Sequence, residues 1–324
     1  MISMKNKKVG IVLEENYTRI ISSISGKVYD NSSVVCWNNL TREIVLVGKD
    51  VENAIGRLDD PLVVIRLLKN YAVQDFEVFK AYLKILVEDF FNVFKNAEVV
   101  VSSPSSDLDF IRDFIYNILK VEGGASSVEF VSKTLLSAIG SNANVNDEYG
   151  VLILDIGYSC SKVALIINGK IEKSGVTIAG EKELDDNIIQ FIKEQYQLVI
   201  NDETVEKIKW SIGTIIKLRD ELELSIFGRD LITNDRRVIV CASAEIKKLF
   251  IRLFTNYKTL ITNVLESSSP IIRSSVIKNG LFVSGDLAGI IGVKDFFEDF
   301  FNFPVTISKK KGYSAIEGAI KYNK

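Results

Sequence analysis

Two stretches of the chain share one order of apolar and polar residues. Val9–Val28 (VGIVLEENYTRIISSISGKV) aligns without gaps with Leu152–Ile171 (LILDIGYSCSKVALIINGKI). Each stretch predicts an apolar strand, a polar tight turn, a second strand, and a Gly-Lys pair before a third strand. Asn168-Gly169 is a dipeptide that favours a type I′ turn between antiparallel strands. The repeat therefore predicts two similar α/β halves, each beginning with a hairpin.

Strands and helices alternate between the two copies. Ser33–Val47 predicts strands, Val73–Phe94 one long amphipathic helix, and Glu98–Val101 a buried strand that stops at Ser102-Ser103-Pro104. A further helix is expected from Asp107 to Lys120. We expect most of its aromatic side chains to be buried, because the period of four from Phe110 to Phe114 defines an inward face; the aromatic residues are Phe110, Phe114 and Tyr116.

The chain after the second copy continues the same alternation. Apolar residues at helical spacing predict two helices, from Leu184 to Tyr196 and from Val205 to Ile212. A strand at Leu281–Val283 then enters the turn Ser284-Gly285-Asp286. Strands that alternate with helices are typical of an α/β protein with mixed sheets.

Composition indicates a folded chain without a basic surface for nucleic acid. The 324 residues include 40 Lys and Arg against 42 Asp and Glu, which gives a formal net charge of −2. The hydrophobic residues make up 47% and the charged residues 25%, so a large core is expected. The length predicts two domains, and the charge balance speaks against nucleic-acid binding.

Two residue types restrict the chemistry. Histidine is absent, which excludes mechanisms that need an imidazole. Cys36, Cys160 and Cys241 are widely spaced and form no CxxC pair, so neither a disulfide framework nor a zinc site is expected. No apolar run approaches the roughly 18 residues that a membrane span needs. We therefore expect a cytoplasmic protein.

Two strand ends carry residues that could bind a phosphate or a metal ion. Asp155-Ile156-Gly157 closes an apolar strand, where a carboxylate can face a divalent cation and glycine lets backbone N–H groups approach a phosphate. Ser284-Gly285-Asp286 has the same character. A hairpin that needs glycine only for its turn would have a similar sequence, so both interpretations stay open at this point.

A longer stretch resembles the signature region of the MreB family of bacterial actins. The matching residues are Ala179-Gly180-Glu181 through Asp185, then Tyr196, and Ile200–Gly213 (INDETVEKIKWSIG). Further similarity to the family lies at Val47-Gly48, Ile55-Gly56-Arg57, Ile65-Arg66-Leu67, Val73, Asp75, Ser137–Gly140, Leu281–Gly285 and Ala315–Ala319. Together these matches cover nearly the whole chain.

The resemblance implies the actin-like fold, which is a duplicated ribonuclease-H-like α/β fold. In this family two domains, each with a large and a small subdomain, flank a nucleotide cleft. The implied large subdomain IA covers 1–28, 72–148 and 312–324, and small subdomain IB covers 29–71. Large subdomain IIA covers 149–179 and 243–311, and small subdomain IIB covers 180–242.

The resemblance also implies a nucleotide site, of which one side is retained. Glu206 and Lys209 lie three residues apart on one helical face, where the family uses a carboxylate for ribose hydroxyls and a lysine stem against adenine. The remaining implied contacts with ATP or ADP and Mg²⁺ are Asp155 for the metal, with Gly157, Ser159, Gly285 and Asp286 for the nucleotide.

The phosphate side departs from the family pattern. Val12, Glu14 and Glu15 stand where the first phosphate loop carries Asp and then Gly-Thr. Two carboxylates there would face an anion, and the loss of Asp removes a group that orients metal-bound water.

The second loop and the connector helix depart in the same direction. Tyr158-Ser159-Cys160 replaces Gly-Gly-Thr, and Asp286 and Leu287 replace two glycines. On the connector helix the family has a Glu-Glu-Pro run with the glutamate that positions the attacking water, and here Val131 is followed by Ser132, Lys133 and Thr134. Lys133 could contribute a point charge to a phosphate oxygen, but no carboxylate remains to act as a base.

We therefore expect an MreB-like cytoskeletal filament protein, for cell shape or motility, with weak or lost ATP hydrolysis and weak or absent nucleotide binding. Self-association into filaments, co-assembly with an MreB paralogue and peripheral contact with the inner face of the cell membrane are expected from the resemblance. Val93 and Phe94 are the residues expected to insert shallowly into a membrane, whereas Phe90 and Phe91 are expected in the core.

Two alternatives stay open. The first is an ATP-hydrolysing filament with an altered active site formed by Lys133, Ser159 and Asp155. The second is a non-polymeric protein of the same fold, such as a sugar kinase or a DnaK-type chaperone. A kinase would need a catalytic aspartate facing a sugar pocket, and no motif for one is present in the sequence.

Overall fold

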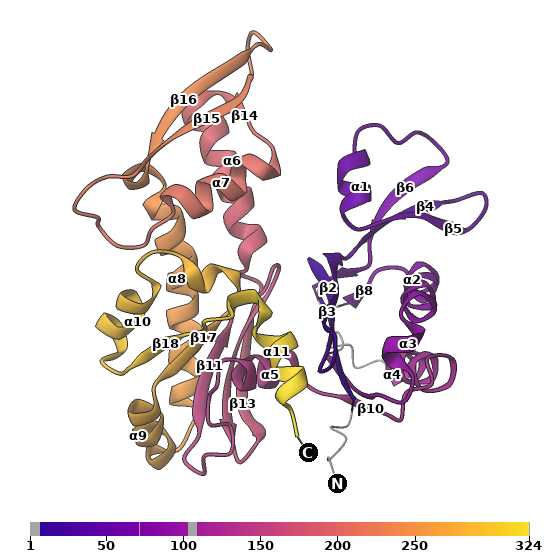
Figure 1. Cartoon of the computed structure of the whole chain (residues 1–324). Coiled ribbons are helices and arrows are strands. Elements are labelled where there is room, and N and C mark those ends of the chain that lie inside the picture. Colours follow the sequence, from indigo (N-terminus) through magenta and orange to yellow (C-terminus); the bar gives the residue numbers. More distant parts are fainter. Residues whose placement is uncertain (1–6, 71, 103–108, 324) are drawn as a thin grey trace. The chain divides into compact units, whose positions relative to one another are not determined.

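The structure is a computed structural model that describes residues 7–70, 72–102 and 109–323 (Figure 1). The chain divides into two compact units. Unit 1 is Met1–Asn142 with Tyr313–Lys324, and unit 2 is Ala143–Gly312. The finer division into subdomains IA, IB, IIA and IIB stays a prediction. Ser103, Pro104 and Asp107, where a strand end and a helix start were expected, lie outside the described residues.

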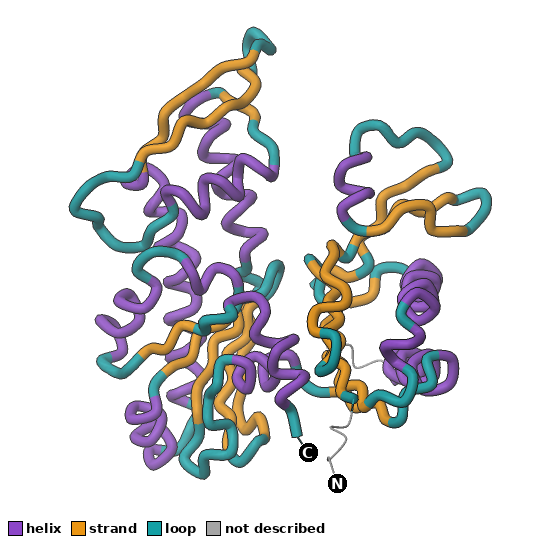
Figure 2. The backbone as a smooth tube through the Cα atoms, viewed as in Figure 1, coloured by secondary structure: helices purple, strands orange, loops and turns teal. Residues whose placement is uncertain are grey.

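Unit 1 is built on a five-stranded sheet of order β10-β9-β1-β2-β3. Figure 2 distinguishes strands, in orange, from helices, in purple. Strand β1 pairs antiparallel with β2 and parallel with β9, and β9 pairs parallel with β10. The smaller sheets are β5-β4-β6 and β7-β8. The strands are β1 (Lys8–Leu13), β2 (Tyr17–Ser22), β3 (Gly26–Ser32), β4 (Val34–Asn38), β5 (Glu43–Val47), β6 (Leu62–Arg66), β7 (Leu68–Lys69), β8 (Ala72–Val73), β9 (Glu98–Ser102) and β10 (Ser127–Phe130).

The helices of unit 1 pack on these sheets, with α1 on the small sheet of β4 and β5. They are α1 (Lys49–Ala54), α2 (Phe76–Asp89), α3 (Phe91–Phe94), α4 (Asp109–Asn117) with the π-helical turn η1 (Ile118–Glu122), α5 (Lys133–Gly140) and α11 (Ser314–Lys321). Asp75 caps the start of helix α2, and its side chain accepts hydrogen bonds from the backbone N–H groups of Glu77 and Val78 at 2.9 and 3.1 Å. This carboxylate satisfies two N–H groups that have no partner inside the helix.

Unit 2 repeats the sheet of unit 1. Its order is β13-β12-β11-β17-β18, with β11 antiparallel to β12 and parallel to β17. The predicted repeat of the hairpin is therefore confirmed, and Asn168 and Gly169 both have positive φ, 47° and 75°, as a type I′ turn requires. The strands are β11 (Val151–Asp155), β12 (Ser161–Ile167), β13 (Lys170–Thr177), β17 (Leu281–Ser284) and β18 (Val305–Ile307).

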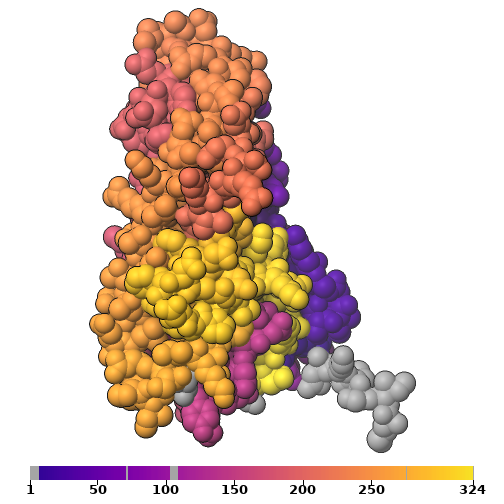
Figure 3. All heavy atoms as spheres, turned by 90° about the vertical axis from the view of Figure 1, so that its left-hand side faces the viewer, coloured from indigo at the N-terminus to yellow at the C-terminus, as the bar shows by residue number. Residues whose placement is uncertain are grey.

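A smaller sheet of order β14-β15-β16 completes unit 2. Its strands are β14 (Leu198–Val199), β15 (Glu223–Asp230) and β16 (Arg236–Ala242). Ile226 and Cys241 on one face are buried, whereas Phe227, Val238 and Val240 on the other face are exposed. In Figure 3 the orange atoms of the β15–β16 hairpin form one end of this unit.

The helices of unit 2 surround both sheets. They are α6 (Glu181–Tyr196), α7 (Asp202–Ile212), α8 (Ser243–Glu266), α9 (Pro270–Asn279) and α10 (Val293–Phe301), with the short 3₁₀ turns η2 (Asp286–Gly289) and η3 (Lys311–Tyr313), of which η3 runs into unit 1. Helix α8 packs on β13 so closely that a Cβ at Gly175 would lie 2.8 Å from Leu260 Cδ1. The two predicted helices after the second hairpin are confirmed as α6 and α7.

The long helix predicted over Val73–Phe94 is wrong at its start and is interrupted near its end. Val73 lies in strand β8, and the helix begins only after Asp75. Phe90 leaves the helical conformation, with φ −111° and ψ 23°, and separates α2 from α3. The apolar period continues across this break, so the sequence pattern alone does not reveal it.

The aromatic residues of α4 do not form its inward face, in contrast to the prediction. Ile111 and Ile115 are buried, whereas Phe110 is 50% and Tyr116 41% exposed. Phe76 makes edge-on ring contacts with Phe110 and with Phe114, with ring centres 5.2 and 5.4 Å apart. Ile111 and Ile115 are four residues apart, as Phe110 and Phe114 are. Packing on the sheet buries the isoleucines, and the spacing alone does not distinguish the two pairs.

Phe94 is also placed differently from the expectation. Its side chain is 1% exposed and belongs to the core of unit 1, so it is not presented for insertion into a membrane. Phe91, which was expected in the core, is 39% exposed, and Val93 is half-buried. The short helix α3 turns Phe94 inward and Phe91 outward.

Helices α5 and α11 cross with their backbones in contact. A Cβ at Gly140 would lie 1.8 Å from the carbonyl oxygen of Ser314, and a Cβ at Gly318 would lie 1.9 Å from that of Leu136. These two glycines therefore set how closely the helices approach. The helices are also the segments of unit 1 that lie next to the two points where the chain passes between the units.

Substitution of Gly140 tests this contact. We expect Gly140→Ala to lower the free energy of unfolding of unit 1 by about 3 kcal/mol, because the methyl group would overlap a backbone oxygen. Gly26→Ala is the matched control: Gly26 has φ +74° but no atom within 4 Å of its Cβ position, so only about 1 kcal/mol of backbone strain is expected. Urea unfolding followed by Trp37 fluorescence in a Trp210→Phe background would measure both; equal losses would contradict the close approach.

Candidate functional site

Two candidate turns meet at the carboxyl ends of β11 and β17. Asp155 lies opposite Ser284 in the parallel pair, and the backbone N–H of Ile156 donates to the carbonyl oxygen of Ser284 at 2.9 Å. Gly285 has φ +101°, and a Cβ there would lie 2.1 Å from the carbonyl oxygen of Ile156. The structure thus brings Asp155, Gly157 and the Gly285–Asp286 turn to one edge of the sheet of unit 2.

The start of helix α6 is joined to the first of these turns. The backbone N–H groups of Glu181 and Lys182 donate to the carbonyl oxygens of Gly157 and Tyr158 at 3.1 and 2.9 Å. Gly180 permits this approach, because a Cβ there would lie 2.2 Å from the carbonyl oxygen of Tyr158. Free N–H groups at a helix start attract anions, and here two of them bond to the turn.

Lys209 on α7 is surrounded by carboxylates. Its side chain is fully buried, and its Nζ lies 2.6 Å from Glu181 Oε1 and 2.8 Å from Asp185 Oδ1. It also forms an ion pair with Glu206, which lies one turn earlier on α7. Glu206 in turn accepts a hydrogen bond of 2.9 Å from Trp210 Nε1.

The charges of this Lys209 cluster shift the pKa values of its members. Burial raises the pKa of Glu181 to about 7 and that of Asp185 to about 6, although Lys209 opposes both shifts. Burial would lower the pKa of Lys209, but Glu181 and Asp185 outweigh it and raise the pKa. One ammonium group faces three carboxylates. The cluster therefore has more acidic than basic groups, and the ammonium group is paired with the carboxylates around it.

The cluster lies beside the Gly285–Asp286 turn. The charge of Asp286 adds to the upward shift of the pKa of Glu181, and Lys311 Nζ lies 5.6 Å from the ring centre of Trp210. Unit 2 therefore brings together the predicted residues Glu206, Lys209, Gly285 and Asp286. Sequence reasoning missed Glu181 and Asp185 as partners of Lys209, although their spacing of four on one helix face would have indicated them.

Unit 1 has a candidate turn of its own, between β1 and β2. Glu14 Oε2 lies 3.2 Å from Lys133 Nζ, and both side chains are about 15% exposed. Glu14 Oε1 is buried without a hydrogen-bond partner among the described atoms. Lys133, which was expected as a point charge for a phosphate oxygen, is thus paired with the carboxylate of the turn. Glu15 Oε2 accepts a hydrogen bond from the backbone N–H of Asn70 at 3.0 Å.

The donor set for a metal ion is sparse. Within the described ranges, no three His, Cys, Asp or Glu side chains are grouped so that they could hold a metal ion. Asp155 is buried, with 2% of its surface exposed. Since Mg²⁺ keeps several water or phosphate oxygens among its ligands, these residues fit a magnesium ion only if it arrives with a nucleotide.

The family assignment rests on comparison with known proteins. The family model "MreB/Mbl protein" matches residues 6–324. The chain belongs to the MreB/Mbl family. The actin-like fold predicted for this MreB/Mbl protein is confirmed as well, by the crystal structure of MreB5 of Spiroplasma citri bound to ADP, which has a TM-score of 0.86 and 26% identity and covers 97% of this chain and 95% of that chain.

Curated relatives carry the same family names. The cell shape-determining protein Mbl of Bacillus cereus is 27% identical over 306 residues, which cover 94% of this chain and 91% of the relative. The cell shape-determining protein MreB of Escherichia coli is 25% identical over 272 residues, which cover 83% and 78%. A structure described as the MamK double helical filament has a TM-score of 0.76 at 17% identity, with 98% of each chain covered, and shares the fold.

The raised pKa values predict a pH dependence of this MreB/Mbl protein. Glu181 and Asp185 have higher pKa values folded than unfolded, so the folded state binds more protons between about pH 4 and pH 7. Their stabilisation is complete below about pH 4 and is lost as the pH rises through about 6 to 7. Glu181→Gln should flatten this decline by on the order of 2 kcal/mol.

Urea unfolding followed by circular dichroism across this pH range would measure the decline. Glu172→Gln, which removes an exposed carboxylate on β13, is the matched control and should leave the profile unchanged. A profile of the Glu181 variant that matches the wild type would contradict the raised pKa of Glu181.

Proposed function

We propose that this protein is a cytoskeletal filament protein of the MreB type, for cell shape or motility, in which ATP hydrolysis is weak or lost. The first part is supported by the relatives, which are named cell shape-determining proteins. It is also supported by the similarity in fold to a protein whose structure is described as a double helical filament. Self-association by copies of this chain is the function that fits these relatives.

The Lys133–Glu14 ion pair carries the second part of the proposal. Hydrolysis needs a carboxylate or an equivalent group to position the attacking water. At the connector helix this chain has a lysine, and its ammonium is neutralised by Glu14 at 3.2 Å. A triphosphate would have to approach the Glu14 carboxylate against charge repulsion, which lowers affinity as well as rate.

The sugar and base side argues for retained but weak binding of ATP or ADP. Structures of MreB5 of Spiroplasma citri are described as bound to ADP and to AMPPNP. In this chain the Glu206 side chain is half exposed, so one of its oxygens could accept from ribose hydroxyls while the other faces Lys209. Asp155, Gly157, Ser159, Gly285 and Asp286 are proposed as the phosphate and Mg²⁺ side of the same site.

Co-assembly with an MreB paralogue and contact with the inner face of the cell membrane are further parts of the proposal. A filament that does not hydrolyse ATP would need concentration, a membrane or an active paralogue to control its assembly. Among the helices that the structure describes, none is long and apolar enough to span a bilayer. The membrane contact proposed from the resemblance is peripheral and would depend on many subunits of one filament.

Calorimetry with ATP and Mg²⁺, combined with sedimentation of the same sample, tests the proposal. We expect weak or no binding heat, pelleting that ATP does not change, and phosphate release at the background rate. Tight binding with ATP-dependent pelleting and sustained phosphate release would instead establish an ATP-hydrolysing filament. A protein that never pellets at any concentration, alone or with an MreB paralogue, would contradict the filament function.

Removal of the Glu14 charge gives a more specific prediction. Glu14→Gln should strengthen ATP binding by about tenfold, because one carboxylate no longer opposes the phosphates. Glu52→Gln, which removes an exposed charge on α1, is the control for net charge. Equal affinities of both variants and the wild type in calorimetry would place Glu14 away from the phosphates.

The exposed ring of Phe91 gives a prediction for membrane contact. Phe91 is 39% exposed, and Lys95 Nζ lies 5.6 Å from its ring centre, a pairing of an apolar and a basic group. Phe91→Ser should lower co-sedimentation with vesicles of phosphatidylglycerol and phosphatidylcholine by about threefold. Phe227→Ser, at an exposed phenylalanine of unit 2, is the control; a similar loss in both variants would contradict a role specific to Phe91.

A further inference from the structure

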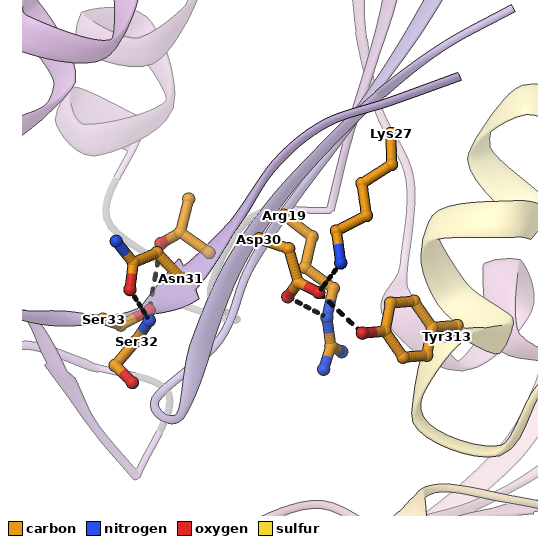
Figure 4. Close-up of polar contacts among 8 residues, drawn as sticks. Arg19, Lys27, Asp30, Asn31, Ser32, Ser33 and Tyr313 are labelled. Carbon is orange, nitrogen blue, oxygen red and sulfur yellow. Dashed lines mark hydrogen bonds and ion pairs between the residues drawn. The ribbon is translucent and has the colours of Figure 1, made fainter. Parts of the chain in front are cut away.

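Asp30 on β3 gathers three donors from different parts of unit 1 (Figure 4). Tyr313 Oη donates to Asp30 Oδ2 at 2.6 Å, Arg19 Nε donates to Asp30 Oδ1 at 3.0 Å, and Lys27 Nζ lies 2.6 Å from Oδ2. Arg19 lies directly opposite Asp30 in the β2–β3 pair. Its guanidinium carbon lies 4.5 Å from the ring centre of Tyr17 and 4.3 Å from that of Tyr313.

These contacts are stronger than ordinary surface ion pairs. The side chains of Arg19 and Asp30 are 7% and 11% exposed. Burial alone would raise the pKa of Asp30, but Lys27, Tyr313 and Arg19 outweigh it and lower the pKa. The hydrogen bond to Asp30 raises the pKa of Tyr313, so its hydroxyl remains a donor. Hydrogen bonds to a charged, partly buried acceptor are the stronger kind.

Tyr313 is also the first residue of unit 1 after the chain leaves unit 2. It is followed at once by α11, whose first residue, Ser314, is fully buried. The aromatic ring and hydroxyl of Tyr313 therefore tie the point of re-entry to the β2–β3 hairpin. That hairpin continues from the β1–β2 turn that carries Glu14.

The preceding residues are tied to unit 2. Ser284 Oγ donates to the carbonyl oxygen of Lys311 at 3.4 Å, and Lys311 has the unusual φ of 46° for a residue with a side chain. Gly312 lies against Asp286, because a Cβ there would be 2.3 Å from Asp286 Oδ1. Lys311 and Gly312 thus rest on the Gly285–Asp286 turn.

Where the chain passes from unit 2 to unit 1, the residues on both sides of the Gly312–Tyr313 peptide bond are therefore restrained. Lys311 and Gly312 are held on the Gly285–Asp286 turn of unit 2, whereas Tyr313 is held on the β2–β3 hairpin of unit 1. A passage with so few unrestrained residues cannot absorb a displacement of the turn locally, whereas a longer loop could. A shift of the turn must therefore either strain Tyr313 or move the hairpin.

We propose that Tyr313 and Asp30 form a latch that transmits the state of the Gly285–Asp286 turn in unit 2 to the β2–β3 hairpin of unit 1. Tyr313 is a positioning residue in this proposal. The latch depends on the proposed function in one respect only, namely that the Gly285–Asp286 turn faces a nucleotide. Its mechanical part can be tested without nucleotide and without filaments.

Hydrogen–deuterium exchange of the full chain without nucleotide tests the latch. Tyr313→Phe removes the hydroxyl and keeps the ring over Arg19. We expect exchange to accelerate by about tenfold in two separate segments. One is the hairpin of residues 17–32 in unit 1, and the other is the turn of residues 281–289 in unit 2.

Tyr322→Phe is the matched control. Tyr322 lies at the other end of α11, and its hydroxyl donates to Glu129 Oε1 at 3.1 Å. Loss of this bond should affect exchange near β10 and leave residues 281–289 unchanged. A role of Tyr313 that is only local would likewise leave residues 281–289 unchanged, and that result would overturn the proposal. A uniform acceleration over the whole chain would overturn it as well.

Asp286→Asn tests the reverse direction, since coupling between two sites is reciprocal. It changes the turn in unit 2, and exchange at residues 17–32 in unit 1 should accelerate. Unchanged exchange there would contradict the latch. Because ATP and filaments are absent from these experiments, a failure of the proposed function and a failure of the latch would be seen in different measurements.

Discussion

The buried ammonium group of Lys209 is the interaction on which the candidate site of unit 2 depends. It joins α6 to α7 through Glu181, Asp185 and Glu206. Taking the Lys209 charge out of water is costly, and the carboxylates of Glu181 and Asp185, 2.6 and 2.8 Å from its Nζ, offset part of that cost. Because the start of α6 also bonds to the turn after β11, the cluster fixes the position of that turn relative to α7.

The two units use the same sheet for different chemistry. In unit 2 the end of the first strand carries a buried aspartate, Asp155, and a glycine turn. In unit 1 the corresponding turn carries Glu14, which pairs with Lys133. The ion pair places an ammonium group on the helix, where the resemblance to the family implies a glutamate for water activation. This replacement of a carboxylate by an ammonium group is the physical basis for proposing a filament whose assembly does not depend on its own ATP hydrolysis.

Close backbone contacts connect these sites to the passages between the units. Gly140 and Gly318 bring α5 and α11 into direct contact, so the helix that carries Lys133 and the helix that follows Tyr313 behave as one packed pair. Asp30 holds the start of α11 on the β2–β3 hairpin. Within unit 1, the turn that carries Glu14 is therefore joined to this pair of helices through Lys133, and the β2–β3 hairpin is joined to it through Tyr313.

The sequence by itself determined the repeated hairpins, the turn at Asn168-Gly169, the helices α6 and α7, and membership of the MreB/Mbl family. These features depend on local periodicity, on the backbone freedom of glycine and asparagine, and on residues adjacent in the chain. Only the tertiary structure decided that Ile111 and Ile115 of α4 face inward in place of Phe110, and that Phe94 is buried. Only the tertiary structure also paired Lys133 with Glu14 and Tyr313 with Asp30. Such choices depend on which surface or charge a distant segment brings near, and local periodicity contains no information about that.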